Sequence, residues 1–250
     1  MRQLEMNDPY TFLKILGYAA LPAAGNLLGI LLARLIALPR WIIGVLLHSS
    51  AGVAMGLIAL ELMPRIQETT PLVELVFAIF AGAALSLLLF YAARYLAGRT
   101  GGRAGTWMVF AALGADLTTD GLMTGAGSAA SLKLGALLAG AQLVANIPGG
   151  FAAGSNLRRT DLGARSLWAA GGTVSLCAFV SAGLGYLILR DADDQMRGAS
   201  LALVTGLLLV ATLEDLVPEG DAPKPPRWGS TLAIAVGFCA LAGVTALSSQ

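Results

Sequence analysis

Charged residues are scarce in this sequence. Only 12% of its 250 residues are Asp, Glu, Lys or Arg, whereas 56% are hydrophobic and the mean hydropathy is +0.75. A soluble domain carries about 25% charged residues, so the composition predicts an integral membrane protein in a lipid bilayer. The net charge of +1 leaves no electrostatic basis for binding nucleic acid.

Histidine and cysteine are also rare, which limits the nitrogen and sulfur ligands available for a metal site. His48 is the single histidine, so no histidine cluster can form. The two cysteines, Cys177 and Cys239, each lie in an apolar run and show neither disulfide nor metal-ligand spacing. We expect both to be small side chains that face lipid or the protein core.

Eight apolar runs, separated by short segments, fill the chain. Each is long enough for a membrane-spanning helix, which needs about 20 apolar residues. The sequence therefore predicts an all-α, polytopic membrane protein with a single transmembrane domain over residues 1–250. The expected spans are Phe12–Ile36, Trp41–Met63, Leu72–Leu96, Thr106–Gly127, Leu132–Gly154, Leu167–Leu189, Ala199–Val217 and Ser230–Leu247.

The distribution of Lys and Arg predicts the orientation of these spans. An even number of spans places both termini on one side, and inner loops are enriched in basic residues. With the N-terminus outside, ten basic residues flank the inner loops and six the outer ones, and the outer loop DADDQ (191–195) is acidic. We expect both termini outside. The short loops suit a bacterial inner (plasma) membrane.

Two apolar segments resemble each other. "AGVAMGLIALELMP" (51–64) ends the second span, and "TGLLLVATLEDLVP" (205–218) ends the seventh. The seventh span is five steps after the second, an odd number, so the two copies run in opposite directions, as inverted repeats of secondary transporters do. Alignment on the final proline makes these pairs: Gly52 with Gly206, Glu61 with Asp215, and Pro64 with Pro218.

Polar residues interrupt the fourth and fifth spans near their midpoints. In "LGADLTTDGLMTGAG" (113–127), Asp116 and Asp120 lie four positions apart, on one helix face, with the Thr119 hydroxyl nearby. A charge at a span centre costs roughly 2.5–3.5 kcal/mol. Two carboxylates also repel each other, so either one is protonated or a cation lies between them.

The fifth span offers matching oxygen ligands. Gln142 and Asn146 have the same four-residue spacing, and Pro148 leaves the carbonyl of Val144 without its helical donor. Amide, carbonyl and carboxylate oxygens suit hard cations such as magnesium, calcium or manganese. The alternatives are that the amides are interhelical hydrogen bonds, and that the aspartates form a protonated pair bonded to them.

Other polar residues are candidates for gating or accessory roles. Glu61, Glu214 and Asp215 lie close to span ends beside prolines, where interfacial water can also solvate them. His48 is either a packed, hydrogen-bonded side chain or a ligand. An intramembrane aspartyl protease needs its two aspartates on facing helices, whereas Asp116 and Asp120 share one helix. We therefore do not expect an enzyme.

Together these segments resemble the ZIP family of metal-ion transporters. In that family the fourth span carries H-N-x-x-[D/E]-G and the fifth carries H-E-x-P-[E/Q]-G, with the metal between them. Here the corresponding residues are 116–121 (DLTTDG) and 145–150 (ANIPGG). The resemblance implies a ZIP-like 3+2+3 arrangement of eight helices, with an inverted repeat of helices 1–3 and 6–8, and often a homodimer.

The departures from the family motifs change the expected ligand set. Asp116 and Ala145 stand where the family has histidine, Asn146 replaces glutamate, and Gly149 replaces the second acid. A two-metal site cannot be assembled as the family builds it. What remains is a single site with two carboxylates, Asn146 and Gln142. Zinc favours nitrogen and sulfur ligands, so the loss of every imidazole favours a harder cation.

The resemblance implies alternating access, in which spans 1, 4, 5 and 6 move against spans 2, 3, 7 and 8. Our first hypothesis is a transporter of a divalent cation, carried as substrate through a site centred on Asp116 and Asp120. A second hypothesis is a transport-inactive ZIP-fold protein that acts as a sensor, partner or scaffold. A third is a transporter of a small, non-metal cationic solute.

Overall fold

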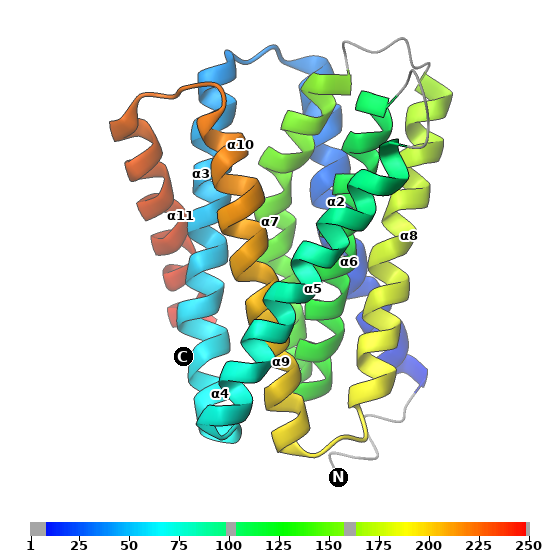
Figure 1. Cartoon of the computed structure of the whole chain (residues 1–250), viewed down its shortest axis with the longest axis vertical. Helices are drawn as coiled ribbons and strands as arrows, with labels where there is room; N and C mark the ends of the chain where they lie inside the picture. Colours follow the sequence, from blue (N-terminus) through cyan, green and yellow to red (C-terminus); the bar gives the residue numbers. More distant parts are fainter. Residues whose placement is uncertain (1–8, 99–103, 158–163, 249–250) are drawn as a thin grey trace.

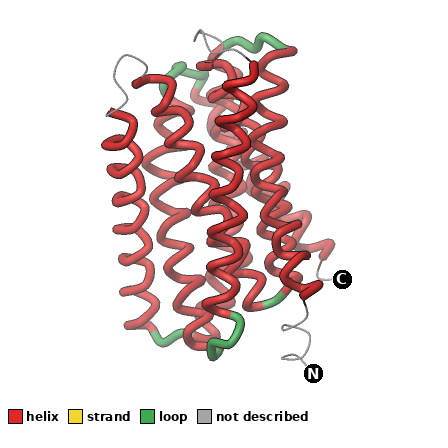
Figure 2. Tube along the Cα trace, turned by 90° about the vertical axis from the view of Figure 1, so that its right-hand side faces the viewer, coloured by secondary structure: helices red, strands yellow, loops and turns green. Residues whose placement is uncertain are grey.

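The computed structural model describes residues 9–98, 104–157 and 164–248. Throughout these residues the chain is helical or forms short turns, which confirms the all-α prediction. The helices run side by side in one bundle, with the connections at its two ends (Figures 1 and 2). Their bounds are α2 Pro9–Leu35, α3 Arg40–Gly56, η1 Leu57–Leu62, α4 Met63–Thr69, α5 Leu72–Gly98, α6 Ala104–Ala130, α7 Leu132–Leu157, α8 Ala164–Leu189, α9 Asp194–Val210, η3 Ala211–Leu216, α10 Val217–Asp221 and α11 Arg227–Ser248.

Each predicted span falls on one continuous helical segment. Among the described residues, seven segments are long and apolar enough to cross a membrane. The exception is α6, which is 27 residues long but carries Asp116, Thr118, Thr119 and Asp120 in its middle. These polar side chains lower its hydropathy, although its length matches the other spans. The chain is therefore an integral membrane protein by length and composition of its helices.

The helix boundaries follow from local sequence. Prolines lie at the starts of α3, α5 and α11, where a missing N–H costs no helical hydrogen bond. Asp193 caps α9 by accepting a hydrogen bond from the Met196 amide at 2.7 Å, and Ser131 caps α7 by accepting one from Leu134 at 3.1 Å. These caps keep the connections short.

The two segments that resemble each other in sequence have the same local structure. α3 and α9 are both 17 residues long, and each is followed by a six-residue π-helix, η1 or η3. A π-helix adds a residue to the turn and is frequently found at functional sites. Figure 1 shows α3 and α9 running in opposite directions along the bundle.

Close helix contacts at glycines define two groups of helices in the bundle. In the first group, α2 packs closely on α7, and α6 on α8; in the second group, α3 packs closely on α11, and α5 on α9. At these contacts a Cβ added to glycine would overlap the backbone of the neighbouring helix. The main pairs are Gly29 with Ile147, Gly150 with Asn26, Gly121 with Ala178, Gly125 with Ala182, Gly52 with Ile234, Gly237 with Ser49, Gly206 with Ile79, and Gly82 with Leu203.

The second group shows the repeat again in its contacts. Gly52 of α3 meets α11, whereas its sequence counterpart Gly206 of α9 meets α5. Conversely, Gly82 of α5 meets α9, and Gly237 of α11 meets α3. α3 therefore packs on the long helix that follows α9 in the chain, and α9 packs on the long helix that follows α3. The small residues let the backbones approach closely, as in other membrane helix pairs.

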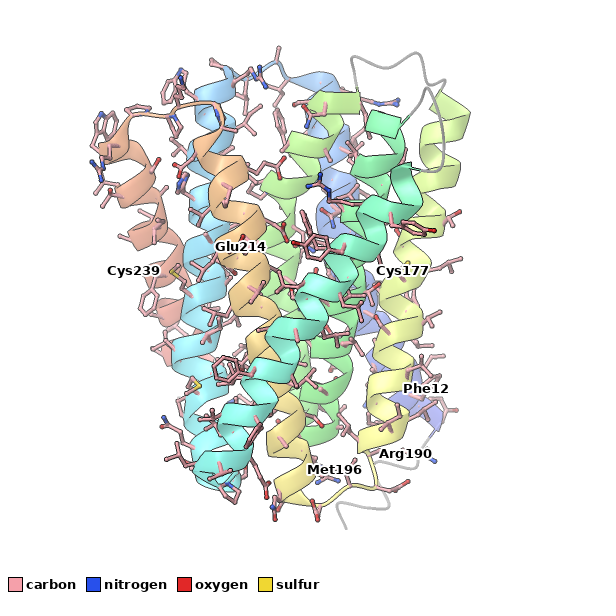
Figure 3. All side chains as sticks on the ribbon, viewed as in Figure 1. Phe12, Cys177, Arg190, Met196, Glu214 and Cys239 are labelled. Carbon is pink, nitrogen blue, oxygen red and sulfur yellow. The ribbon has the colours of Figure 1, made fainter. Side chains whose placement is uncertain are left out.

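Large apolar side chains point outward, where a soluble protein would present charge. On α5, Phe77 is 72% exposed and Phe80 is 70% exposed. Side chains project from the outer helices all around the bundle in Figure 3. Cys239 is an exposed free thiol on α11, and Cys177 is partly buried and also free, in agreement with the expected lipid-facing or core positions.

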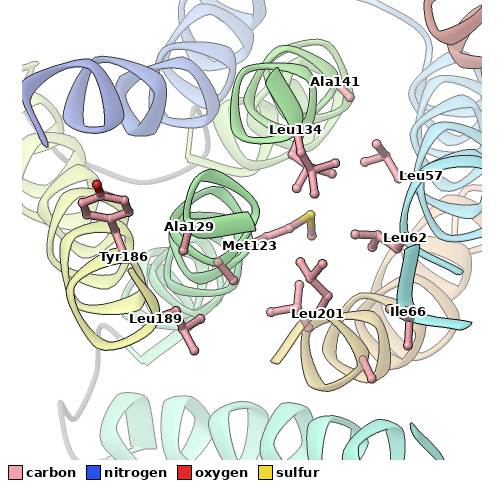
Figure 4. Packing of buried hydrophobic residues seen from close by; sticks show 14 of the residues in the cluster. Leu57, Leu62, Ile66, Met123, Ala129, Leu134, Ala141, Tyr186, Leu189 and Leu201 are labelled. Atoms are coloured by element: carbon pink, nitrogen blue, oxygen red, sulfur yellow. The ribbon is translucent and has the colours of Figure 1, made fainter. Parts of the chain in front are cut away.

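The main apolar core fills the bundle between the helix groups, toward one end. Figure 4 shows Met123 of α6 surrounded by Leu134 of α7, Leu57 and Leu62 of η1, and Leu201 of α9. Met123 and Leu62 have no exposed surface. Because Met123 follows Asp120 by three residues, this core lies about one turn from the mid-span carboxylates.

Candidate functional site

The Asp120 carboxylate is bound by a residue of the neighbouring span. Asn146 of α7 donates through Nδ2 to Asp120 Oδ2 at 2.6 Å, and the same nitrogen lies 3.3 Å from the Pro22 carbonyl oxygen of α2. Asp120 is only 8% exposed. The structure therefore brings two predicted site residues together, and adds a backbone oxygen from a third helix.

Asp116 lies one turn from Asp120 on the same face of α6 and is partly buried. It interacts electrostatically with Asp120 and also with Asp215 and Glu219, which come from the η3–α10 segment. Asp215, predicted as an accessory residue, thus lies on the Asp116 side of the site. Glu219 is an acid that our sequence reasoning did not select, because it falls just beyond the repeat.

The threonines between the aspartates donate their hydroxyl hydrogens within α6. Thr118 donates to the Gly114 carbonyl at 2.7 Å, and Thr119 donates to the Ala115 carbonyl at 3.2 Å. Hydroxyls that bond to the preceding turn of their own helix satisfy themselves within the membrane. Thr119 is buried, but its hydroxyl hydrogen is used inside α6.

Gln142 binds α6 through the backbone and not through either carboxylate. Its Nε2 lies 3.3 Å from the Asp120 carbonyl oxygen and 3.2 Å from Met123 Sδ, and its Oε1 accepts a hydrogen bond from Thr124 at 3.0 Å. The side chain is 3% exposed. This geometry is that of the interhelical hydrogen-bond alternative, with one acceptor position of the amide oxygen taken by Thr124.

The carbonyl that Pro148 leaves without its helical donor lies on an exposed part of α7. Val144, whose carbonyl loses its donor to Pro148, is 59% exposed. The helical period places Val144 on the opposite face of α7 from Gln142 and Asn146, away from the side that meets Asp120. The carbonyl of Ala145 instead accepts a hydrogen bond from Ser50 of α3 at 2.7 Å.

His48 and Glu61 have partners other than the two aspartates. His48 is buried on α3; its Nδ1 is 2.8 Å from the Gly44 carbonyl oxygen, and its Nε2 is 3.3 Å from Asp221 Oδ1. It is the packed, hydrogen-bonded histidine of the two alternatives. Glu61 is buried in η1 and pairs with Arg65 at 3.4 Å. Glu214 is exposed (Figure 3).

Besides Glu219, two buried polar residues escaped the sequence reasoning. Ser50 joins α3 to α7 next to Asn146, and Asn26 is 4% exposed on α2. Asn26 occurs singly in an apolar span, and Ser50 follows His48 and Ser49. Neither has a second polar residue one turn away that would have marked a polar face. Only the packing of α2 and α3 on α7 reveals them.

The donor set at the site consists of oxygens. The two aspartates, the Asn146 amide and the Pro22 carbonyl can bind a hard cation. Within the described residues, no group of three or more His, Cys, Asp or Glu side chains is arranged to hold a metal ion. Comparison of the chain with protein-family models and with curated proteins gives no match.

Proposed function

We propose that this protein is a ZIP-like membrane transporter of a divalent metal cation, with its substrate site between α6 and α7. The observation that carries the proposal is the Asp120–Asn146–Pro22 contact, in which oxygen-bearing groups of three helices converge near mid-span. Placing Asp116 and Asp120 within a membrane span is unfavourable in free energy, and a cation that binds both carboxylates would offset this.

The arrangement of the helices supports alternating access by two bodies. The first helix group holds the site, and the second consists of the two segments with matching structure and opposite direction. This division coincides with the 1, 4, 5, 6 and 2, 3, 7, 8 sets of the family resemblance. A 3+2+3 inverted repeat, a homodimer and outside termini stay predictions that go with this proposal.

Uptake of zinc, iron, manganese, cobalt, cadmium and magnesium ions into proteoliposomes tests the proposal. We expect flux of at least one of these ions in the wild type, abolished by Asp116→Asn with Asp120→Asn. The matched control is Asp191→Asn with Asp194→Asn, which removes two exposed carboxylates from one end of the bundle and should leave flux unchanged. A folded wild type that carries none of the ions contradicts the proposal.

A second candidate is a transport-inactive ZIP-fold protein that serves as a sensor, partner or scaffold. It is favoured by the way the mid-span groups satisfy one another: Asn146 binds Asp120, and Thr124 engages the Gln142 oxygen. The same flux assay separates the two candidates. A stable protein without flux, in which the two aspartate substitutions change neither stability nor oligomeric state, supports the scaffold.

A further inference from the structure

Asn26 is a buried polar side chain with an unsatisfied atom. It lies on α2, is 4% exposed, and its Nδ2 has no hydrogen-bond partner within the described part of the chain. A buried donor without a partner costs about 1–3 kcal/mol, and native proteins rarely leave one unexplained. An apolar residue of similar size would pack at this position without that cost.

The position of Asn26 is set by two glycines of α7. Its backbone packs directly on Gly150, and its Oδ1 is 3.9 Å from the place that a Cβ of Gly149 would occupy. Gly149 follows Gln142 by seven residues, or two turns, so it lies on the face of α7 that contacts α6. The Asn26 amide therefore reaches across Gly150 into the space between α2, α6 and α7.

The register of the three helices brings this amide to the level of Asp116. Pro22, Asn146 and Asp120 meet at one level. Since α2 and α7 run in one direction and α6 in the other (Figure 1), one turn further leads to Asn26, Gly150 and Asp116. α2 and α6 also touch at this depth, through Ala23 and Leu117.

Resting on the proposed function, we infer that Asn26 is a further ligand of the transported cation, completing from α2 a site shared with Asp116, Asp120 and Asn146. The absence of a side chain at Gly149 leaves the room that the Asn26 amide enters. Asparagine oxygens are ordinary ligands of calcium and other hard cations. Half a turn about the terminal torsion exchanges the amide oxygen and nitrogen, so the oxygen can face the ion.

The test uses isothermal titration calorimetry to measure Mn²⁺ binding to the purified protein in nanodiscs. Asn26→Leu removes both polar atoms at similar volume, and we expect it to weaken Mn²⁺ binding by about tenfold or more. Asn26→Asp adds a carboxylate and should tighten binding. The two single variants should therefore shift the Mn²⁺ affinity in opposite directions, which substitutions of a purely structural asparagine would not do.

Ser128→Ala is the matched control. Ser128 is also fully buried, and its hydroxyl oxygen has no hydrogen-bond partner among the described residues, but it lies against Gly135, toward the end of α6. Its removal relieves the same kind of defect and should leave Mn²⁺ affinity unchanged. Should Asn26→Leu fail to fold, the tighter binding expected for Asn26→Asp still decides the matter.

The outcomes separate this inference from the proposed function. Wild-type binding that neither Asn26 substitution alters overturns the assignment of Asn26 and leaves the α6–α7 site standing. A wild type that binds neither Mn²⁺ nor any other ion of the transport panel overturns both. A raised melting temperature for Asn26→Leu together with weakened Mn²⁺ binding is the expected signature of a ligand kept at the expense of stability.

Discussion

Gln142 and Asn146 both carry a carboxamide group and lie on one face of α7, yet they have different partners. They are separated by a single turn of α7, yet Asn146 meets the Asp120 carboxylate and Gln142 meets the Asp120 carbonyl, Met123 and Thr124. The longer Gln142 side chain lies beside the apolar core around Met123, where its polar atoms have no water to bind. It is satisfied by α6 alone and joins the two helices.

We predict that Gln142 and Thr124 contribute to stability and not to substrate binding. In a double-mutant cycle of Gln142→Leu and Thr124→Val, the coupling free energy should be about 0.6 kcal/mol and no more than about 1.7 kcal/mol, as for other hydrogen bonds between membrane helices. Reversible unfolding in mixed micelles measures it. Both single variants should keep the ion affinity of the wild type, and a large loss of affinity in Gln142→Leu would restore Gln142 to the ligand set.

At the scale of the helices, small residues decide which elements can approach each other. α7 carries two glycines with opposite surroundings: a Cβ on Gly150 would overlap the Asn26 backbone, whereas a Cβ on Gly140 would meet no atom within 4 Å. The close contact along α2 and α7 depends on Gly150. Gly140 has open space around it, and as a glycine inside a helix it lowers stability through its backbone freedom.

This difference predicts opposite effects of one substitution at two places in the same helix. Gly150→Ala should destabilise the protein by about 1–3 kcal/mol, because α2 and α7 must move apart to accept the methyl group. Gly140→Ala should stabilise it by about 0.5–1 kcal/mol. Melting temperatures of the purified variants provide the measurement. Equal effects at the two positions would mean that α2 and α7 do not pack as described.

At the scale of the whole molecule, the bundle consists of two helix groups with differently built contacts. The eight glycine contacts named above, at which two helix backbones approach closely, each lie within one group. Between the groups lie side chains of the apolar core and the Ser50–Ala145 hydrogen bond. Side chains can slide past one another more readily than interlocked backbones, so relative motion is expected at this boundary.

We predict that a covalent link across this boundary stops transport. In a chain with Cys177 and Cys239 replaced by alanine, Ser50→Cys with Ala145→Cys connects α3 to α7. Cross-linking with a short thiol-reactive reagent should lower ion flux at least about tenfold, since alternating access needs the helix groups to rearrange.

The control pair is Thr124→Cys with Gln142→Cys, which links α6 to α7 inside the first helix group, where the native side chains are 3.0 Å apart. Cross-linking this pair should leave most of the flux of the same variant before treatment. If both links stop transport equally, the two groups do not move as units.

The sequence by itself determined the class of protein and the order of its spans. Apolar runs of membrane length, basic loops and prolines at span ends are local properties, and a helix in lipid must satisfy its backbone internally whatever its neighbours are. The positions of Asp116, Asp120 and Asn146 near mid-span followed from the same local count. The alignment of Gly52 with Gly206 also followed from the sequence, because the resemblance of the two segments is visible in the order of their residues.

Only the tertiary structure decided which polar atoms meet. A helix face spans several residues, and the sequence does not contain the rotation and depth of one helix against the next. Packing turned Gln142 toward the Asp120 backbone and Asn146 toward its carboxylate, took the Ala145 carbonyl to Ser50, and brought Asn26 over Gly149. Side-chain contacts between helices depend on ångström-scale offsets, which are set by the summed packing of the whole bundle.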